Sequence, residues 1–381
     1  SFTYRNLYLY HLLELRVMTI KDVAQTLEEF APLANAEDFD NVGLLLGSYH
    51  TQITGILVTL DTLEQTVDEA IAKNCNLIVS FHPIIFSGLK KITGKNYVER
   101  VVLKAIQNDI AIYAIHTALD NMPHGVSKGM CDALNLEQRK ILIPKKGAIK
   151  KLTTYVPKNE VITVREALFK AGAGNIGNYE ECSFSTKGKG TFKGNEHSNP
   201  SVGNRGELHI EKEVQLNITF EARLQSQILS ALFAAHSYEE VAYEITTLDN
   251  ANQNIGMGMI GELPEALEEL DFLNQVKKAF HAEGIRYSAL RGQSVKKVAV
   301  LGGSGSFAID AAKAAGADAL ITADLKYHQF YQAEGQIVLA DIGHYESEQY
   351  TKNILTDFLT KKFTNFAVVL SDENTNPIKY L

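Results

Sequence analysis

The chain has few cysteines: only Cys75, Cys131 and Cys182 occur among its 381 residues. Their number is odd, they lie far apart, and none belongs to a C-x-x-C pair, which argues against a disulfide framework and a thiolate zinc site. No apolar run is long enough to span a membrane, and the start of the chain lacks the small-residue cleavage signature of a secretory signal. We therefore expect reduced thiols in a cytoplasmic protein.

The chain also lacks an excess of positive charge. The 37 lysines and arginines are outnumbered by 45 aspartates and glutamates, which gives a net charge of −8. Proteins that hold nucleic acid through phosphate contacts need a basic face, so this balance argues against a nucleic-acid partner. The composition, with 45% hydrophobic and 22% charged residues, is that of a globular protein. At this length two domains are expected.

Short, continuously apolar strands separated by helices predict a buried parallel sheet in the first part of the chain. Ligands bind beyond the carboxyl ends of such strands, and a polar side chain follows each of the three early strands. This predicts a site at one edge of the sheet. The strands are residues 56–60, 77–80 and 110–115, and the side chains that follow them are Asp61, His82 and His116.

Threonines mark two expected helix starts. Thr19 is the candidate N-cap of a helix to residue 30, and Thr62 is the candidate cap of a helix to about residue 73. Between them the acidic segment 37–44, taken alone, reads only as a loop. Met18 looks like a natural beginning, so we interpret residues 1–17 as a start-site extension or a disordered arm.

A different order of elements runs from about residue 151 to residue 250. It reads as βαββαβ, which is typical of the ferredoxin-like arrangement. The elements are expected at residues 152–156, 164–171, 181–193, 208–220, 224–235 and 241–245. The sequence therefore predicts an α/β body in two halves, 18–145 and 251–381, that is split by an α+β insert at 151–250.

A histidine and a glutamate stand four residues apart after the last apolar run of this body. His344 and Glu348 would project from one face of a helix, which is the spacing of a metal-ligand pair. The alternative is an ordinary helix start, where the dipole favours Glu. Polar groups at other strand ends favour the metal site.

The strongest candidate constellation is His82, Asp120, His344 and Glu348. Imidazole and carboxylate without thiolate suit Zn, Mn, Fe or Co, and a carboxylate shared by two ions lets their water ionise near neutral pH. Further groups are candidates for outer positions or substrate contacts: Asp61, His116, Asp324 and His328. The alternative is that the histidines are separately satisfied core or surface groups.

A glycine-rich turn follows the expected strand 298–301. Gly303 to Ala308 fits G-x-G-x-x-A, and Asp324 lies at about the distance of a ribose-binding carboxylate. A tight turn at a helix start explains the same pattern and would still hold phosphate on its backbone N–H groups. We favour the turn, because Asp324 falls after the next strand, beside His328. No Walker lysine follows, which argues against an ATP-hydrolysing P-loop.

Six motifs in order resemble the Nif-three-like family, whose bacterial members are often labelled GTP cyclohydrolase I type 2 homologues. They are residues 39–44, 80–86, 116–120, 302–305, 324–328 and 341–348. The resemblance extends from Met18 nearly to the end of the chain. It implies a body of parallel-rich sheets flanked by helices, with the PII-like or CutA-like insert of longer members, and a ring-shaped homohexamer.

The resemblance also implies a site and an activity. One or two divalent ions would be held by His82, Asp120, His344 and Glu348, with Glu348 shared. The protein would be a metal-dependent hydrolase of a nucleotide or another phosphate-containing small molecule, with a histidine moving a proton. The proton-moving candidates are His116 and His328, and the substrate-binding or phosphate-binding candidates are Gly303, Ser304, Gly305, Asp61 and Asp324.

One residue departs from the family pattern at the site. Members usually have two adjacent histidines before the proline, and here the first is Phe81. If each histidine serves one ion, the second ion keeps only His344, Glu348 and water, and its site is expected to be weak or empty. Phe81 therefore supports an alternative function: a non-catalytic metal-binding oligomeric scaffold or regulatory protein with a ligand-sensing insert.

Overall fold

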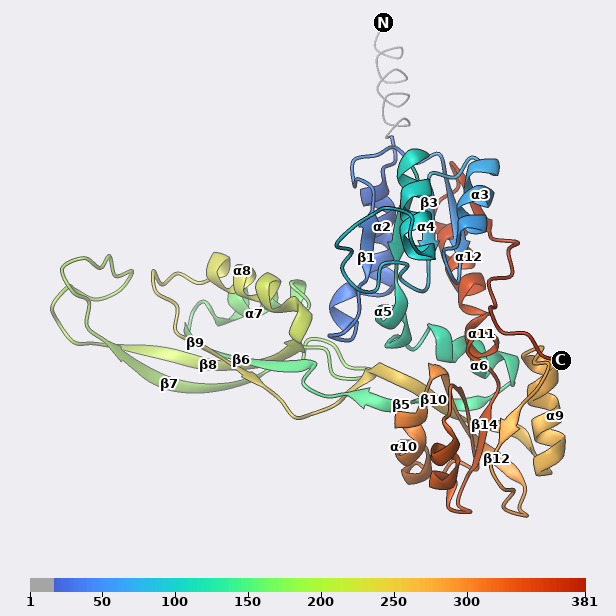
Figure 1. Ribbon diagram of the computed structural model, residues 1–381. Coiled ribbons are helices and arrows are strands. Elements are labelled where there is room, and N and C mark those ends of the chain that lie inside the picture. Colours follow the sequence, from blue (N-terminus) through green and yellow to red (C-terminus); the bar gives the residue numbers. More distant parts are fainter. Residues whose placement is uncertain (1–16) are drawn as a thin grey trace, which may run out of the picture. The chain divides into compact units, whose positions relative to one another are not determined.

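The computed structural model describes residues 17–381, so the predicted extension at residues 1–17 lies outside the described residues except for Val17. The chain forms two compact units (Figure 1). One runs to Ile143 and resumes at Gly256, and the other is Pro144–Ile255, a range that includes the predicted insert 151–250. Among residues 17–381, no helix is long and apolar enough to cross a membrane.

A five-stranded sheet lies in the first unit, with strand order β1-β4-β3-β2-β15. Four strands are parallel and the edge strand β1 is antiparallel to β4. Every residue of β2, β3 and β4 is buried, which explains their continuous apolar runs. The interpretation of 37–44 as only a loop was wrong at its end, where β1 begins. The bounds are β1 Gly43–Leu46, β2 Gly55–Thr59, β3 Leu77–Ser80, β4 Ala111–Ala114 and β15 Ala367–Leu370.

Helices cover both faces of this sheet, because alternate strand residues point to opposite sides. Ile56 and Val58 pack with helices α2 and α12, whereas Leu57 packs with α3 and α4. The bounds are α2 Ile20–Phe30, α3 Glu64–Ala72, α4 Tyr97–Gln107 and α12 Thr351–Lys362.

The two predicted helix caps had different outcomes. Thr19 is the N-cap of α2, and its backbone N–H and its hydroxyl both donate to the Asp22 carboxylate at 2.8 Å. Thr62 is not the cap of α3. That helix begins at Glu64 with Leu63 as N-cap, and the Leu63 N–H donates to Thr66 Oγ1 at 3.2 Å. The hydroxyl of Thr66, the third residue of α3, therefore accepts from the backbone N–H of the N-cap residue, and the expected cap at Thr62 is not formed.

A six-stranded sheet completes the first unit, with order β11-β14-β13-β12-β10-β5. Strands β12, β13 and β14 are parallel, β10 is antiparallel to β12, and β11 is antiparallel to β14. Helices α9 and α10 cover opposite faces (Figure 1), where Val298 packs with α9 and Ala299 with α10. The bounds are β5 Glu137–Lys145, β10 Asn252–Leu267, α9 Glu269–Ala279, β11 Arg286–Tyr287, β12 Val295–Ser304, α10 Ile309–Ala314, β13 Ala319–Ala323 and β14 Val338–Asp341.

The unit Pro144–Ile255 holds a four-stranded antiparallel sheet of order β7-β8-β6-β9. Its elements follow the order βαββαβ. Helices α7 and α8 lie on one face (Figure 1), over the buried side chains of Leu152, Leu216 and Ile218. The bounds are β6 Ile149–Pro157, α7 Val161–Lys170, β7 Phe184–Phe192, β8 His209–Glu221, α8 Gln225–Ala235 and β9 Tyr243–Thr247.

Candidate metal centre

Residues that follow strands of the two sheets in the first unit meet at one group of side chains. His82 comes two residues after β3, and the short helix α11 (His344–Glu348) follows β14. Gly343, at φ +95°, makes the turn into α11, and a glycine adopts this left-handed region without a steric penalty. His344 and Glu348 then occupy the first and last positions of a single helical segment, as their spacing predicts.

The centre of this group is the carboxylate of Glu348, which is 3% exposed. Its Oε2 lies 3.0 Å from His82 Nε2 and 3.1 Å from His344 Nε2. Nevertheless this buried oxygen accepts no hydrogen bond from the described residues. The ligand atoms of the three residues lie within 4.8 Å of one another. Three converging ligand atoms that form no hydrogen bonds with one another fit a shared cation, because all three can bind it.

Carboxylates fix the orientation of both imidazoles from behind. His82 Nδ1 lies 2.8 Å from Asp61 Oδ1, and His344 Nδ1 lies 2.6 Å from Asp324 Oδ2. An ionised carboxylate only accepts, so each Nδ1 carries the hydrogen and each neutral imidazole keeps its lone pair on Nε2. This is the usual outer support of metal-binding histidines. Of the two positions expected for Asp61 and Asp324, outer support or substrate contact, the structure shows outer support of the two histidines.

Charge interactions within the group shift the pKa values of its three members. Burial by itself would lower the pKa of His82, but the carboxylates of Glu348 and Asp61 raise it to about 10. The pKa of His344 is likewise raised to about 11, against burial, by Asp324 and Glu348. Burial would raise the pKa of Glu348, yet the two imidazoles lower it to about 2. All three pKa shifts favour the charged form of their group. A divalent cation between these carboxylates would take the place of the protons on the imidazoles.

Asp120 and His116 lie at the two ends of α5 (His116–Asp120) and line a cavity of about 240 Å³ together with His344 and Glu348. Asp120 stands outside the compact group of three ligands. Burial and the neighbouring Glu348 raise its pKa well above the usual range. The ring centroid of His116 is 5.2 Å from that of His82. Both residues are therefore beside the group, one as a further carboxylate and one as a further imidazole.

Asp40 is a site residue that sequence reasoning did not single out, although it lies in the motif 39–44. Its side chain is fully buried, and its Oδ1 lies 2.8 Å from His116 Nδ1. It also accepts from the backbone N–H and the hydroxyl of Thr117 at 3.0 and 2.5 Å. Burial would raise the pKa of Asp40, but these bonds lower it to about 2. Asp40 is thus an ionised support of His116.

The glycine turn lies at the site, and two of its backbone N–H groups bond within the fold. The Gly303 N–H donates to Ser347 Oγ at 2.8 Å, and the Gly305 N–H donates to the Ala323 carbonyl at 3.4 Å. A Cβ at Gly303 would lie 2.5 Å from Glu348 Oε1, so close approach explains this glycine. Ser304 Oγ donates to Asp324 at 2.5 Å. Two backbone N–H groups of this turn are therefore already used within the fold, and phosphate binding by the turn stays a prediction.

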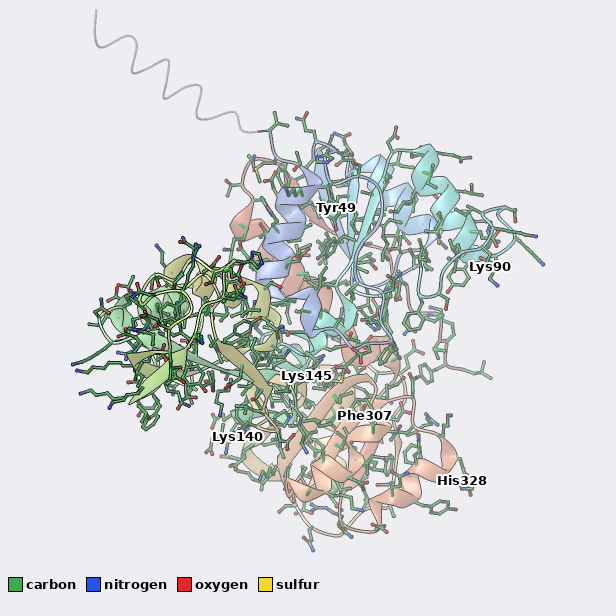
Figure 2. All side chains as sticks on the ribbon, turned by 90° about the vertical axis from the view of Figure 1, so that its left-hand side faces the viewer. Tyr49, Lys90, Lys140, Lys145, Phe307 and His328 are labelled. Atoms are coloured by element: carbon green, nitrogen blue, oxygen red, sulfur yellow. The ribbon has the colours of Figure 1, made fainter. Side chains whose placement is uncertain are left out.

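His328 is not brought to the group. It lies in the 3₁₀ segment η4 (Tyr327–Ala333), its side chain is exposed, and it is absent from the residues that line the cavity. Its ring contacts are with Tyr327 and Tyr331, at centroid distances of 5.1 and 6.2 Å. Figure 2 shows it at the margin of the first unit. Of the two proton-moving candidates, His116 alone lines the cavity.

We expect Thr375→Val to weaken zinc binding about threefold to tenfold. Thr375 Oγ1 donates to Asp61 Oδ2 at 2.7 Å, so the change loosens the carboxylate that orients His82. The effect should be smaller than that of Asp61→Asn, since outer partners of a ligand cost about 10- to 100-fold. Competition with a chromophoric chelator measures the affinity. Thr364→Val, the same change at an exposed position, should have no effect, and an equal loss there would contradict the interpretation.

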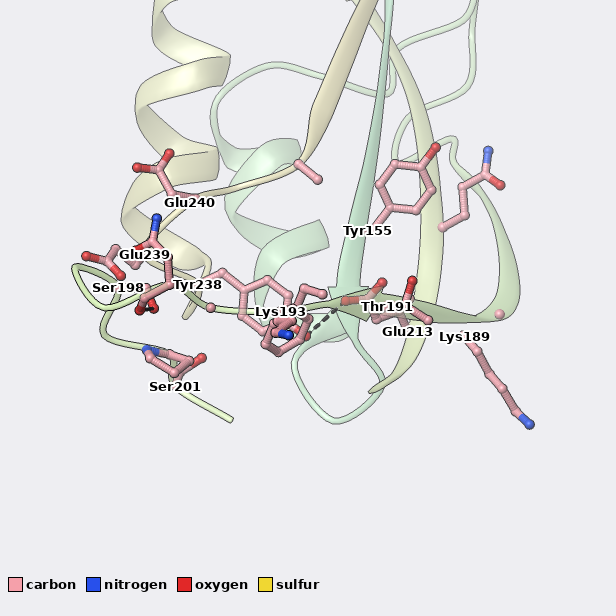
Figure 3. A pocket seen from close by; sticks show the side chains of 18 of the residues that line it. Tyr155, Lys189, Thr191, Lys193, Ser198, Ser201, Glu213, Tyr238, Glu239 and Glu240 are labelled. Atoms are coloured by element: carbon pink, nitrogen blue, oxygen red, sulfur yellow. Dashed lines mark hydrogen bonds between the residues drawn. The ribbon is translucent and has the colours of Figure 1, made fainter. Parts of the chain in front are cut away.

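A second cavity of about 690 Å³ lies in the unit Pro144–Ile255, and sequence reasoning did not find it (Figure 3). It lies beside β7 and the segment around Tyr238. The Tyr238 hydroxyl donates to Glu213 Oε1 at 2.9 Å, and Lys193 lies near this pair in Figure 3, whereas Lys189 points away. Its lining carries both lysines and glutamates, so its charge does not select one sign of ligand.

Comparison with known proteins gives consistent matches over nearly the whole chain. The profile of Duf34/NIF3 (NGG1p interacting factor 3) matches residues 18–377. A Bacillus subtilis (strain 168) protein named GTP cyclohydrolase 1 type 2 homolog is 36% identical over 371 residues, which are 95% of this chain and 98% of that protein. A protein of the same name from Halalkalibacterium halodurans is 36% identical over 373 residues, 96% and 100% of the two chains.

A solved structure agrees with these matches. The crystal structure of a Bacillus cereus protein related to NIF3 superimposes with a TM-score of 0.83 at 34% identity, over 96% of this chain and 100% of that one. The Staphylococcus aureus structure with a TM-score of 0.78 at 28% identity covers the same shares. The α/β fold is therefore shared over nearly the whole length, and the chain belongs to the Duf34/NIF3 (NGG1p interacting factor 3) family.

Proposed function

We propose that the protein binds one or two divalent metal ions through His82, Asp120, His344 and Glu348 and hydrolyses a nucleotide or another phosphate-containing small molecule. The observation that carries this proposal is the buried Glu348 Oε2, which faces two imidazole Nε2 atoms at 3.0 and 3.1 Å without a hydrogen bond. The name of the relatives, GTP cyclohydrolase 1 type 2 homolog, supports a nucleotide as substrate. Zn, Mn, Fe and Co suit these donors.

Individual residues of the chain have separate roles in the proposed reaction. A bound ion would supply Lewis-acid polarisation and lower the pKa of water. Asp61 and Asp324 keep the Nε2 atoms of His82 and His344 available for the ion. His116 donates its Nδ1–H to Asp40, so its Nε2 is the basic atom and accepts a proton inside the cavity. A buried carboxylate behind the imidazole stabilises the cation that this transfer forms.

A second candidate function, a metal-binding scaffold or regulatory protein without catalysis, is favoured by Phe81. This side chain is fully buried in the core between the sheet and α2, with its ring 4.9 Å from that of His82. An apolar ring at this position offers no ligand for a second ion. In this function the cavity of the unit Pro144–Ile255 would be the place where the insert senses a ligand.

Three further features belong to the proposal. The βαββαβ order and the antiparallel sheet support a PII-like or CutA-like insert. The ring-shaped homohexamer is proposed from the family resemblance. The cytoplasm is proposed from the cysteines, of which Cys75 and Cys131 are buried as free thiols.

Elemental analysis of purified protein tests the metal site and its stoichiometry together. We expect one ion per subunit in the wild type and a rise toward two in Phe81→His, because the new imidazole would lie next to His82 in sequence. Tyr113→His, which changes another fully buried aromatic residue of the same core, should leave the count unchanged. Two ions in the wild type would show that another group replaces the missing histidine. No ion in any variant would refute the proposed function.

A further inference from the structure

We propose that the cavity beside the metal centre admits the planar heteroaromatic ring of a nucleoside, while the phosphate end of the substrate stays outside. This inference rests on the proposed function, because it concerns the substrate of the same site. It replaces the expectation that the glycine turn holds phosphate. Four properties of the cavity carry it: its aromatic walls, its charge, its size and the use of the Gly303 and Gly305 N–H groups within the fold.

Two exposed phenylalanines line the cavity. Phe39 is 66% exposed and Phe307 is 56% exposed, and both line the cavity that also contains His116, His344 and Glu348. Figure 2 labels Phe307 on the first unit. The ring of Phe86, which does not line the cavity, is tilted against that of Phe39 at a centroid distance of 6.4 Å. Exposed aromatic faces around a polar concave site are stacking platforms for planar rings, and such stacking tolerates different bases.

The charge around the cavity disfavours phosphate. Among the residues that line it, all within the described part of the chain, there is no lysine or arginine. Five carboxylates surround the three histidines: Asp40, Asp61, Asp120, Asp324 and Glu348. Two divalent ions would bring four positive charges and still leave these carboxylates in excess by one. An anionic group gains little in such surroundings, whereas a neutral ring pays no electrostatic penalty.

Size and backbone geometry agree with this assignment. The cavity of about 240 Å³ is smaller than the roughly 300–1,000 Å³ of sites that enclose a drug-sized ligand, so it suits a ring better than a whole nucleotide. The N–H groups of Gly303 and Gly305 are already used within the fold. The short helix that follows, α10, has six residues. The substrate would therefore present its base to the metal centre between the two phenylalanines.

Fluorescence of 2-aminopurine riboside tests this assignment with a readout independent of turnover. The chain contains no tryptophan, so protein emission does not mask the probe, and stacking on an aromatic ring quenches it. We expect the zinc-loaded protein to bind the probe with quenching, and Phe39→Ala and Phe307→Ala each to weaken binding about ten- to a hundredfold. Phe39→Tyr should retain binding and Phe39→Leu should not, because stacking needs the ring face.

The control is Phe184→Ala, which removes an equally exposed phenylalanine from β7, and it should leave binding unchanged. The 5′-monophosphate of the probe should bind no more tightly than the riboside. Tighter binding of the monophosphate, or displacement of the probe by ribose 5-phosphate, would overturn the inference. A changed sedimentation coefficient in Phe39→Ala or Phe307→Ala would also overturn it, since the rings would then belong to a contact between copies.

The failures of the two proposals are distinguishable. If zinc binds to the wild type but not to His344→Ala, the metal centre is supported. If the probe then does not bind to the zinc-loaded wild type, the base assignment is wrong. If the wild type binds no metal, the proposed function itself falls.

Discussion

Glu348→Gln is expected to purify without bound metal and to weaken added zinc more than about a hundredfold, beyond the usual cost of losing an outer partner. Glutamine keeps the shape of the side chain but removes the negative charge that faces His82 and His344 at 3.0 and 3.1 Å. Its amide NH₂ would meet at least one imidazole Nε2 as a donor and occupy the lone pair that the ion needs. Elemental analysis and chelator competition measure both effects.

The helix itself supplies a matched control. Glu346 lies two residues earlier on α11, is equally buried at 6% exposure, and accepts from Asn376 Nδ2 at 2.9 Å without facing the imidazoles. Glu346→Gln therefore makes the same chemical change in the same segment, and metal content should be kept. If both variants lost metal, damage to α11 would explain the result and the ligand role of Glu348 would lack support. If Glu348→Gln kept its metal, the proposed centre would be wrong.

The central group was predictable because its signals are local. His82 and His116 each follow a buried apolar strand, and parallel strands end at one edge of a sheet. His344 and Glu348 need only one helical turn to meet. Pattern and spacing therefore brought together the residues that the structure places within 4.8 Å: His82, His344 and Glu348.

The supporting residues were not predictable in the same way. A strand-end aspartate gives the same sequence signal whether it faces a substrate or the back of an imidazole, so the sequence left both positions open for Asp61 and Asp324, and the structure places them behind the imidazoles. Asp40 and Thr375 reach their partners across 76 and 314 residues of sequence, and no local pattern reports such a pair. The hydrogen bond of the Gly303 N–H was not predictable for a similar reason. The pattern G-x-G-x-x-A does not say that Ser347 occupies the backbone N–H.

Strand β10 was not predicted from the sequence, and its composition explains why. Strand β10 (Asn252–Leu267) begins with polar residues and contains Gly256, Gly258 and Gly261, so it lacks the apolar run that identified its parallel neighbours. Antiparallel strands at the side of a sheet need less burial than central parallel ones. At Gly261 a Cβ would lie 2.7 Å from the Glu137 carbonyl of β5, so this glycine serves the close approach of two strands.

The largest loss of stability is expected from Arg291→Met, which should lower the free energy of unfolding by about 3–5 kcal/mol. The Arg291 side chain is 6% exposed and bonds to Glu269, Asp318 and the Ser294 carbonyl at 3.3, 2.8 and 2.9 Å. It joins the start of α9 to the loop before β12 and the residue before β13. Methionine fills the volume but leaves two carboxylates, one of them as buried as the arginine, without their cation.

Thermal unfolding should show this as a fall in Tm of roughly 6 °C or more, and amide exchange in β12 should localise it to the first unit. Arg100→Met is the matched control. Its guanidinium bonds Glu64 at 3.0 Å, but both side chains are largely exposed, so the loss should stay below about 1 kcal/mol. Equal losses in the two variants would mean that burial of the Arg291 pair does not matter.

The cost of Arg291→Met should also depend on pH. Burial by itself would raise the pKa of Asp318, but the N–H groups of Lys297 and Lys296 and the Arg291 guanidinium hold it below its ordinary value. Stability from ionised Asp318 is therefore present above the unfolded-state pKa of about 3.9 and is lost as pH falls through the lower folded-state value. The difference in Tm between wild type and variant should narrow in acid. A difference that is constant down to that range would assign the loss to packing, because packing does not titrate.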